Sequence, residues 1–341
     1  MKNILITSAG RRTYLVKYFK EYLNGNGEVH VANSSALSPT FEVADKYVVT
    51  PLIYDDNYIP FLLEYCKNNS ISAIISLFDI DLPVLAKHRD EFESIGAKLI
   101  ISDYDFVNIC NDKWESFNYL KENGLPVPKT YIDLEKAIED INNNNLNYPL
   151  IIKPRWGCGS LSIFKVNNEE ELRVLYKKCR EEILNSYLKY EANKDIDKSV
   201  LIQEIIAGEE YGMDVINDLN GNYINTIIRK KVGMRSGETD CAEIMNISEL
   251  KRIGESLSKL SKHVANLDVD VLGKDDLYYV LELNARFGGG YPFSHLSGVN
   301  LPGAIIEWLD GKEAPKSFFE EKVGIIGQKD ISIIELTKVK K

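Results

Sequence analysis

Two kinds of hydrophobic pattern alternate along the first third of the chain. Short apolar runs indicate buried strands, and between them apolar residues recur every three or four positions, as in amphipathic helices. The expected strands are residues 3–9, 29–33, 46–50, 73–78 and 97–102, and the expected helices are residues 13–23, 59–69 and 84–92. Strands that alternate with helices predict right-handed βαβ units and a parallel sheet. The pattern therefore predicts a Rossmann-like α/β domain over residues 1–108.

The rest of the chain has a different pattern, in which strands follow one another directly. After an expected helix and a linker with two prolines, the apolar runs predict a mixed α+β region. The expected helices are residues 103–124, 169–190 and 248–267, and the expected strands lie within 149–166, 199–206, 210–218, 222–232 and 268–287. The final pair is expected to form a hairpin with Gly273 in its turn region, and residues 331–341 are expected to form a tail.

Composition and charge narrow the classes of protein. Hydrophobic residues make up 44% and charged residues 27% of the 341 positions, as in ordinary globular proteins. No apolar run reaches the roughly 20 residues of a membrane span, and the N-terminus resembles a strand more than a secretory signal, so we expect a cytoplasmic protein. A net charge of −10 argues against a broad nucleic-acid surface. The five scattered cysteines form no CxxC pair and predict neither disulfides nor a zinc site.

One expected strand, residues 281–287, has an unusual polar face. Side chains alternate along a strand, so Leu281 and the next apolar residues should face the core, with Glu282, Asn284 and Arg286 opposite. Carboxylate and amide oxygens suit Mg²⁺, and a guanidinium neutralises a phosphoryl oxygen. An ordinary exposed strand face is the alternative. On the preceding strand, either Asp268 or Asp270 is a candidate for a further ligand, although acids flank many strands.

A glycine-containing stretch, KPRWGCGS at residues 153–160, is a candidate anion site. Gly157 and Gly159 would allow backbone N–H groups to approach an anion closely, and Lys153 lies just before them. The stretch lacks the GxxxxGK[ST] pattern of a Walker A loop. A hairpin turn without a ligand is the alternative interpretation.

The stretch QEIIAGEEYGMDV at residues 203–215 is a candidate nucleoside site. Ile205 and Ile206 would sandwich a flat base, and Glu210 would accept hydrogen bonds from ribose hydroxyls. An ordinary hairpin is the alternative interpretation.

Two basic features remain. Residues 229–239 form the densest basic stretch of an acidic chain and include Arg235, which predicts a mobile loop that closes on an anion, with a solvated hairpin tip as the alternative. Lys113 is expected in the middle of a helix, where a lysine is ordinarily solvated.

Taken together, five motifs in order resemble the ATP-grasp superfamily, in particular the branch that includes the large chain of carbamoyl-phosphate synthase and related carboxylate–amine ligases. The motifs are SAGRR near the start, NDK with Lys113, IIKP with Lys153, the stretch 203–215 and LELNARFGGG. The resemblance implies an N-terminal Rossmann-like (pre-ATP-grasp) domain followed by a two-lobed ATP-grasp domain over residues 109–330. Its small lobe would cover about residues 125–205 and its large lobe about residues 206–330.

The resemblance also implies roles for individual residues. Lys113 and Lys153 would hold the α- and β-phosphates, and a glycine loop would cover the phosphates. The loop comprises Gly157, Gly159 and Ser160; the adenine pocket comprises Gln203, Glu204 and Ile206, with Glu210 at the ribose; the metal ligands are Glu282, Asn284 and Asp270 or Asp268; and the catalytic cations are Arg286, Lys153 and Arg235. The loop departs from the family pattern because it is short and carries Trp156 and Cys158.

The implied activity is an ADP-forming ligase that uses ATP and Mg²⁺, with Mn²⁺ as an alternative ion. A carboxylate would attack the γ-phosphate to form an acyl phosphate, and an amine would then displace phosphate to form a C–N bond. Phosphorylation of bicarbonate or carbamate is the alternative, although full carbamoyl-phosphate synthesis needs two phosphorylations and the chain has room for one module. A non-catalytic ATP-binding protein is a third hypothesis. A dinucleotide oxidoreductase is a fourth, but SAGRR lacks GxGxxG.

The sequence leaves the substrates open. Arg11, Arg12, Asp79 and Asp81 follow expected parallel strands, at the sheet edge where α/β proteins bind ligands. The arginines would contact a carboxylate and the aspartates an amine, with ordinary surface loops as the alternative. His295 is a candidate for the acceptor pocket, with a packed loop histidine as the alternative. We expect small-molecule carboxylate and amine partners, no nucleic acid and no membrane, with a homodimer left open.

Overall fold

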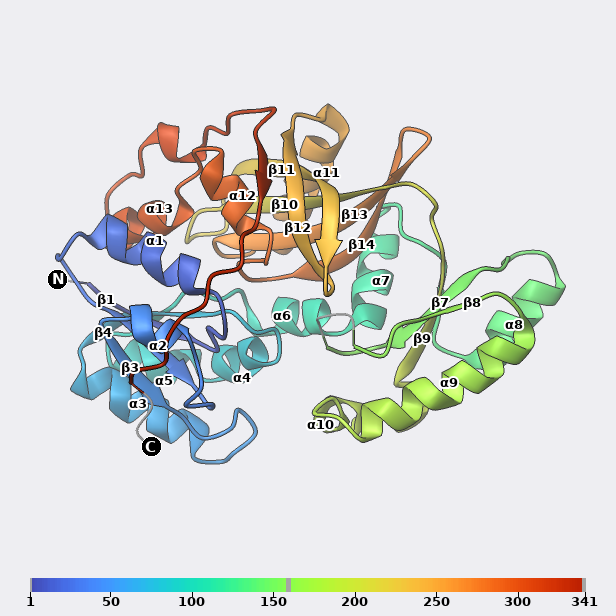
Figure 1. Cartoon of the computed structure of the whole chain (residues 1–341), viewed down its shortest axis with the longest axis horizontal. Coiled ribbons are helices and arrows are strands. Elements are labelled where there is room, and N and C mark those ends of the chain that lie inside the picture. Colours follow the sequence, from blue (N-terminus) through green and yellow to red (C-terminus); the bar gives the residue numbers. More distant parts are fainter. Residues whose placement is uncertain (1, 158–160, 339–341) are drawn as a thin grey trace.

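The computed structural model describes residues 2–157 and 161–338. It contains three sheets, which Figure 1 separates clearly. The N-terminal sheet and its helices lie at the lower left of the view, a larger antiparallel sheet lies above, and a small sheet lies at the right. Cys158, Gly159 and Ser160, for which the sequence predicts a glycine loop, lie outside the described residues.

The N-terminal sheet is parallel throughout and has the strand order β3-β2-β1-β4-β5. This confirms the predicted βαβ pattern. The strands are β1 (Asn3–Thr7), β2 (Val29–Asn33), β3 (Lys46–Val49), β4 (Ile71–Ser76) and β5 (Lys98–Leu99), and the helices are α1 (Thr13–Leu23), α2 (Thr40–Val43), α3 (Tyr58–Asn68), α4 (Asp81–Lys87) and α5 (Arg89–Ser94). The helix expected at 84–92 is therefore two short helices.

The helix predicted over residues 103–124 is broken at Asp112. It forms α6 (Tyr104–Asn111) and α7 (Lys113–Glu122). Asp112 has an extended backbone, and its carboxylate accepts hydrogen bonds from the amides of Trp114 and Glu115, which is the geometry of an N-cap. Lys113 is consequently the first residue of α7. The sequence prediction, which placed it in the middle of a helix, was wrong. The domain boundary expected between residues 108 and 109 falls inside α6.

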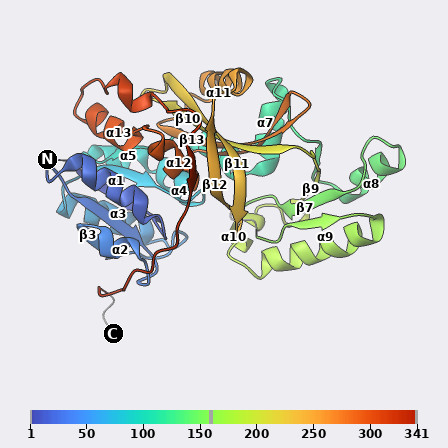
Figure 2. The same ribbon diagram turned by 45° about the horizontal axis from the view of Figure 1, so that its top comes forward.

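The small sheet has the order β6-β9-β7-β8, and its strand pairs are antiparallel. Its elements are β6 (Thr130–Tyr131), α8 (Leu134–Asn142), β7 (Leu150–Pro154), β8 (Phe164–Val166), α9 (Glu169–Leu184), α10 (Lys189–Ala192), η1 (Ile196–Lys198) and β9 (Val200–Glu204). Figure 2 shows α9 running along this sheet. Ile152, Val166, Leu172 and Ile202 are part of a separate core beneath α9.

The large sheet has the order β14-β13-β10-β11-β12-β15 and is antiparallel. The basic stretch 229–239, expected to be a mobile loop, is mostly the end of β11 and the start of β12, so the hairpin alternative holds. The last hairpin turns at Asp275 and Asp276, not at Gly273. The elements are β10 (Glu209–Asn217), β11 (Tyr223–Arg235), β12 (Glu238–Met245), α11 (Ser248–Ser261), β13 (Asn266–Lys274), β14 (Leu277–Asn284), α12 (Tyr291–Leu296), α13 (Leu301–Leu309), η2 (Lys316–Phe319) and β15 (Ile326–Gln328).

The two larger parts are packed together and share their hydrophobic cores. One core joins Leu5 and Ile74 of the N-terminal sheet to Met213 and Val269 of the large sheet. No described helix is long and apolar enough to cross a membrane.

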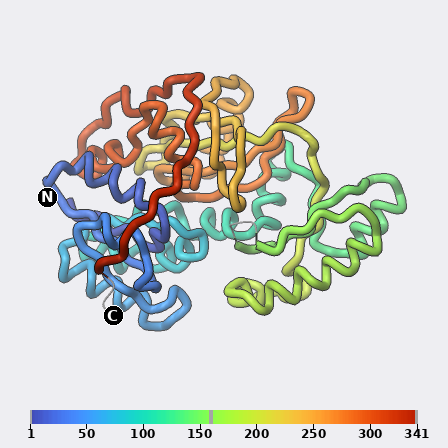
Figure 3. Tube along the Cα trace, viewed as in Figure 1, coloured from blue at the N-terminus to red at the C-terminus, as the bar shows by residue number. Residues whose placement is uncertain are grey.

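The C-terminal segment, residues 329–338, ties these two parts together. It leaves β15 and runs to the N-terminal sheet, as the red end of the tube in Figure 3 shows. The hydroxyl of Thr337 and the amide of Lys338 each donate to the Glu42 carboxylate at 2.8 Å. The ammonium of Lys338 also donates to the carbonyl of Phe41 at 2.7 Å.

Candidate functional site

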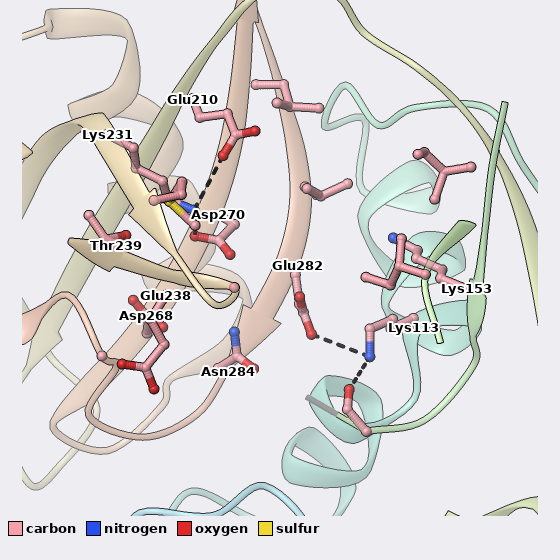
Figure 4. A pocket seen from close by; sticks show the side chains of 18 of the residues that line it. Lys113, Lys153, Glu210, Lys231, Glu238, Thr239, Asp268, Asp270, Glu282 and Asn284 are labelled. Atoms are coloured by element: carbon pink, nitrogen blue, oxygen red, sulfur yellow. Dashed lines mark hydrogen bonds and ion pairs between the residues drawn. The ribbon is translucent and has the colours of Figure 1, made fainter. Parts of the chain in front are cut away.

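A cavity of about 520 Å³ lies where the three sheets meet, and its lining includes most of the residues that the sequence singles out. Figure 4 shows Lys113 and Lys153 on one side of this cavity, with Lys231, Glu238 and Asp268 on the other. The predicted residues that line it are Arg12, Lys113, Lys153, Gly157, Gln203, Glu204, Ile205, Ile206, Glu210, Asp268, Asp270, Glu282, Asn284 and Arg286. The chain therefore brings together side chains that are distant in sequence.

Lys113 owes its position to the capped start of α7. The Arg155 guanidinium contacts the Asp112 carboxylate at 2.7–2.9 Å, and both side chains are nearly buried. The amide of Lys113 donates to the carbonyl of Arg155 at 3.1 Å. The Lys113 ammonium lies 3.4 Å from Oε1 of Glu282 and also donates to the carbonyl of Gly157. The ammonium is thus held between the glycine stretch and the acidic strand.

Lys153 is buried, and its hydrogen bond partner is a neutral amide. Its ammonium donates to Oε1 of Gln203 at 2.8 Å, and Gln203 Nε2 donates to the hydroxyl of Thr130 at 2.8 Å. Burial, helped by the charge of Lys113, lowers the pKa of Lys153 from 10.5 to about 8, against the opposing charges of Glu282 and Asp270. Because both ends of its amide are engaged, we assign Gln203 to positioning Lys153, not to reading a base as the resemblance implied.

Apolar side chains from the small sheet, the large sheet and the segment between them also line the cavity, and together they are called the apolar slot. Ile151, Ile163, Ile206, Leu272 and Leu281 all contribute to the lining. Leu281 is there because the register of β13 and β14 shifts between Asp270 and Val271, so strict alternation fails and Leu281 joins the polar face. The sequence prediction that Leu281 faces the core was wrong for this reason.

Glu204 and Glu210 also line the cavity, and they lie close in sequence to Ile206 of this slot. The Glu204 carboxylate accepts from the amide of Lys129 at 2.6 Å. The Glu210 side chain is half exposed, and its Oε2 lies 3.9 Å from the Lys231 ammonium. A flat apolar group in the slot would therefore have a carboxylate available for its polar substituents.

Oxygen-bearing side chains face one another across β13 and β14. Asp270 lies opposite Glu282, and Asp268 lies opposite Asn284. Burial raises the pKa of Asp270, and the neighbouring carboxylates of Asp268 and Glu282 raise it as well, against the opposing charge of Lys231. A divalent cation would relieve this repulsion, so the residues suit one. No group of three or more His, Cys, Asp or Glu side chains in the described residues is arranged for a metal, and the set here has two carboxylates and one amide.

The two candidate aspartates differ in their partners. The Asp268 carboxylate contacts both Arg229 and Arg286. Burial tends to raise the pKa of Asp268, but the charges of these two guanidiniums prevail and lower it. Asp270 has one closely bound cation, Lys231, with Nζ 2.7 Å from Oδ1. The geometry favours Asp270 over Asp268 as the further metal ligand.

Arg286 links the large sheet to the N-terminal sheet. Its Nη1 lies 3.1 Å from Oδ2 of Asp268, and its Nη2 lies 2.9 Å from Oδ2 of Asp79. Asp79 is thus bound to Arg286 and is not among the lining residues. The fully buried Arg229 extends the network to Asp214. The sequence analysis placed Arg229 and Lys231 in a basic loop and did not single them out as site residues, although their spacing of two positions fits one face of a strand.

Each glycine of the run 288–290 lies close to a charged group. A Cβ atom at Gly288 would be 2.1 Å from the carboxyl carbon of Asp268, and one at Gly290 would be 2.1 Å from Nε of Arg229. At Gly289 the nearest group, the Glu238 carboxylate, would be 3.5 Å away. The glycines at 288 and 290 allow the backbone to pass beside the buried charge network.

Besides Asp79, four predicted site residues among the described part of the chain lie outside the lining of the cavity: Asp81, Arg11, Arg235 and His295. The buried Asp81 carboxylate accepts hydrogen bonds from the hydroxyls of Thr7, Ser8, Tyr58 and Ser76, so we assign it a structural role and withdraw it as a substrate contact.

Arg11 and Arg235 are also corrected, and His295 agrees with its alternative. Arg11 is exposed, and Arg12 lines the cavity in its place. Arg235 ends β11 and pairs with Asp240 at 2.8 Å, so its catalytic role is withdrawn. His295 stacks on Tyr18 with ring centroids 3.6 Å apart, in agreement with the packed-histidine alternative.

The model of the ATP-grasp domain matches residues 110–290, more than half of the chain, and the chain belongs to this family. A model described as the PylC-like N-terminal domain matches residues 4–100. The resemblance inferred from the five motifs is thereby confirmed.

The individual proteins that resemble this chain have low sequence identity to it. The carbamoyl phosphate synthase large chain of Pseudothermotoga lettingae is 22% identical over 83% of this chain. The match covers 25% of that protein, so the chain spans about a quarter of the relative's length. An L-amino acid ligase from Bacillus licheniformis has 20% identity and a TM-score of 0.70 over 95% of this chain and 78% of its own.

A third similarity is to a biotin carboxylase domain dimer of the Hydrogenobacter thermophilus 2-oxoglutarate carboxylase, described in complex with MgADP, ADP and bicarbonate. Its identity is 16% and its TM-score 0.71, over 92% of this chain and 70% of its own. At these identities the two solved structures show a shared fold.

Proposed function

We propose that this protein is an ADP-forming ligase that activates a carboxylate as an acyl phosphate and joins it to an amine. The observation that carries the proposal is the convergence of Lys113, Lys153 and Arg286 with Glu282 and its neighbouring oxygens on a single cavity. Three cations and a set of oxygen ligands are what the approach of a carboxylate to a triphosphate needs, since both reactants are anions.

The nucleotide would lie along the Lys153 side of the cavity. Its base fits the apolar slot that includes Ile206, its ribose hydroxyls reach the half-exposed Glu210, and its phosphates extend between Lys113 and Lys153. Magnesium, or manganese in its place, would neutralise phosphate charge, with Glu282, Asn284 and Asp270 as its protein ligands. Gly157 lies beside Lys113 and is suited to the phosphate end.

The chemistry follows from these positions. A carboxylate oxygen attacks the γ-phosphorus, the bond to the bridging oxygen breaks, and ADP leaves with the electron pair. Lys113 and Lys153 offset the charge on the phosphates, and Arg286 presents a guanidinium fixed by Asp79 and Asp268. An amine then attacks the acyl carbon and releases phosphate. Much of the rate enhancement would come from this fixed arrangement of charges.

The deciding experiment is a screen of carboxylates, each with and without an amine, for release of ADP. An ADP-forming ligase gives ADP and phosphate only when both substrates are present, and a product with a new amide or peptide bond appears by mass spectrometry. ADP release with bicarbonate and ammonia alone would support the carbamoyl-phosphate alternative, which the relatives of the chain favour. Calorimetry that detects no heat on mixing ATP and Mg²⁺ with the protein would overturn every version of the proposal.

The same preparation tests the assembly state. A biotin carboxylase domain of the same fold is described as a dimer, and we carry a homodimer of this chain as part of the proposal. Sedimentation at several protein concentrations distinguishes a dimer from a monomer.

A further inference from the structure

Most cations that line the cavity are paired with an acid. Lys113 pairs with Glu282, Lys231 with Asp270, Arg229 with Asp214 and Asp268, and Arg286 with Asp79 and Asp268. The charge of a paired cation is partly offset by its acid, whereas a cation without an ion pair has more of its charge available for a substrate. A cation of the lining that has no ion pair and is not assigned to the phosphates is therefore a candidate contact for a further anionic group.

Arg12 is such a cation on the N-terminal side of the cavity. Its Nη1 donates to the carbonyl of Leu77 at 2.5 Å and lies 3.4 Å from the carbonyl of Phe287. Within residues 2–157 and 161–338 it forms no ion pair with a carboxylate. Two carbonyls thus fix one nitrogen of a half-buried guanidinium, and because this guanidinium forms no direct ion pair, it can contact an anionic ligand group.

Glu238 is an acid on the same part of the cavity. It is the first residue of β12, and Figure 4 draws it on the side away from Lys113 and Lys153. Among the described residues it forms an ion pair with Lys329, with Nζ 3.4 Å from Oε2, and its side chain is 54% exposed. Glu238 itself lines the cavity, so this half-exposed carboxylate is accessible to a ligand there.

The two groups flank the same short stretch of backbone. Arg12 lies against the carbonyl of Phe287, and the Glu238 carboxylate lies 3.5 Å from where a Cβ atom of Gly289 would be. Only Gly288 separates Phe287 from Gly289 in the chain. The Arg12 guanidinium and the Glu238 carboxylate therefore lie beside neighbouring backbone positions of the cavity wall. A ligand that satisfies both must carry a negative and a positive charge close together.

We propose that Arg12 and Glu238 form a subsite for a free amino acid, with its carboxylate on Arg12 and its ammonium group on Glu238. The inference rests on the proposed ligase function and assigns one of its two substrates to the class of amino acids. Glu238 is a specificity-determining residue, since a substrate that has a carboxylate but no ammonium group would not pair with the Glu238 carboxylate. Arg12 selects a charged carboxylate over a neutral amide.

The experiment measures each charge separately. ADP release is first screened with the standard amino acids, as single compounds and in pairs, alongside plain carboxylates with simple amines. For an amino acid that binds, two analogues are used as competitive inhibitors: its carboxamide, which lacks the negative charge, and its des-amino acid, which lacks the ammonium. Loss of a charge-assisted hydrogen bond should weaken each analogue by about 10- to 100-fold in the unaltered protein.

The variants should change only the matching preference. R12Q should abolish the preference for the carboxylate over the carboxamide while keeping the preference for the ammonium, and E238Q should do the reverse. R11Q and R235Q are matched controls, because Arg11 adjoins Arg12 and Arg235 lies on the same hairpin as Glu238, yet both lie outside the cavity lining. A general distortion of the site would alter both preferences together.

Failure of this subsite is distinguishable from failure of the ligase function. ADP release with plain carboxylates and simple amines, but with no amino acid, would overturn the subsite and leave the ligase proposal standing. The subsite is also overturned if an amino acid reacts and both variants keep both preferences.

Discussion

The guanidinium of Arg155 contacts the carboxylate of Asp112 at 2.7–2.9 Å and thereby links the two lysines of the site. Asp112 caps the helix that begins with Lys113, and Arg155 follows the strand that carries Lys153. One buried ion pair thus sets the position of both ammonium groups.

Replacing Arg155 with methionine should therefore weaken nucleotide binding through both lysines. Removing one partner of a buried ion pair leaves the other charge uncompensated, at a cost of about 3–5 kcal/mol. Urea unfolding measures this loss, and calorimetry measures the affinity for ATP. R180M is the control, because Arg180 pairs with the exposed Asp197 on the protein surface. Equal stability of R155M and R180M would show that the Arg155–Asp112 pair does not have this role.

The lowered pKa of Lys153 predicts a pH dependence of ATP binding. Its ammonium is fully charged well below pH 8 and is lost as the pH rises through about 8. Above that value, affinity should fall by at most about tenfold per pH unit, if the neutral amine contributes nothing. K153R retains its charge over this range, so its affinity should stay level between pH 7 and about 9.5. A flat profile for the unaltered protein would contradict the assignment.

The lowered pKa of Lys153 also affects the free energy of unfolding, which should rise with pH where the affinity for ATP falls. The folded pKa of about 8 is below the ordinary value of 10.5, so the unfolded chain binds more protons between these values. The free energy of unfolding contributed by Lys153 therefore rises with pH across this window. K153M should consequently be more stable than the unaltered protein at pH 7, and urea unfolding at pH 7 and pH 10 should show this advantage shrinking.

Glu282 should be essential for turnover. E282Q removes one preorganised charge contact, which typically lowers turnover by about 10²-fold or more, and should raise the magnesium concentration needed for half-maximal rate. E209Q serves as the control, because Glu209 pairs with Lys230 outside the cavity. Near-normal turnover of E282Q at saturating ATP and magnesium would exclude Glu282 as a metal ligand.

The glycine run predicts a contrast between adjacent positions. G290A would bring a Cβ atom to 2.1 Å from Nε of the buried Arg229, whereas G289A would place it 3.5 Å from the Glu238 carboxylate, an ordinary contact. Overpacking should cost G290A about 1–3 kcal/mol, and G289A should unfold close to the unaltered protein. Coincident urea midpoints for the two variants would contradict this account.

The sequence predicted the parallel N-terminal sheet because its apolar runs alternate with amphipathic helices, and the order of motifs predicted the family. It predicted one helix over 103–124 because hydrophobic periodicity continues through Asp112. The break depends on Arg155, 43 positions away, which holds the capping carboxylate.

The candidate site was predicted less completely for similar reasons. Glu282 and Asn284 were found from strand alternation, but the bulge that turns Leu281 into the cavity has no local signature. Asp81 was misassigned because the sequence near the end of a strand does not show whether an aspartate contacts a ligand or, as here, four hydroxyl groups of the protein. Arg12 and Arg11 are neighbours, and only their packing distinguishes them.

The C-terminal segment has a consequence for the size of ligand that the cavity accepts. Since Lys338 and Thr337 fasten the segment after β15 to α2, the large sheet that carries Glu238 and the N-terminal domain that carries Arg12 are joined at a second place. If these two side chains bind one substrate, as proposed, this link restricts the length of the compound that fits between them. Lys153 belongs to a sheet with its own core, so the part of the chain proposed to hold the nucleotide lies outside this link.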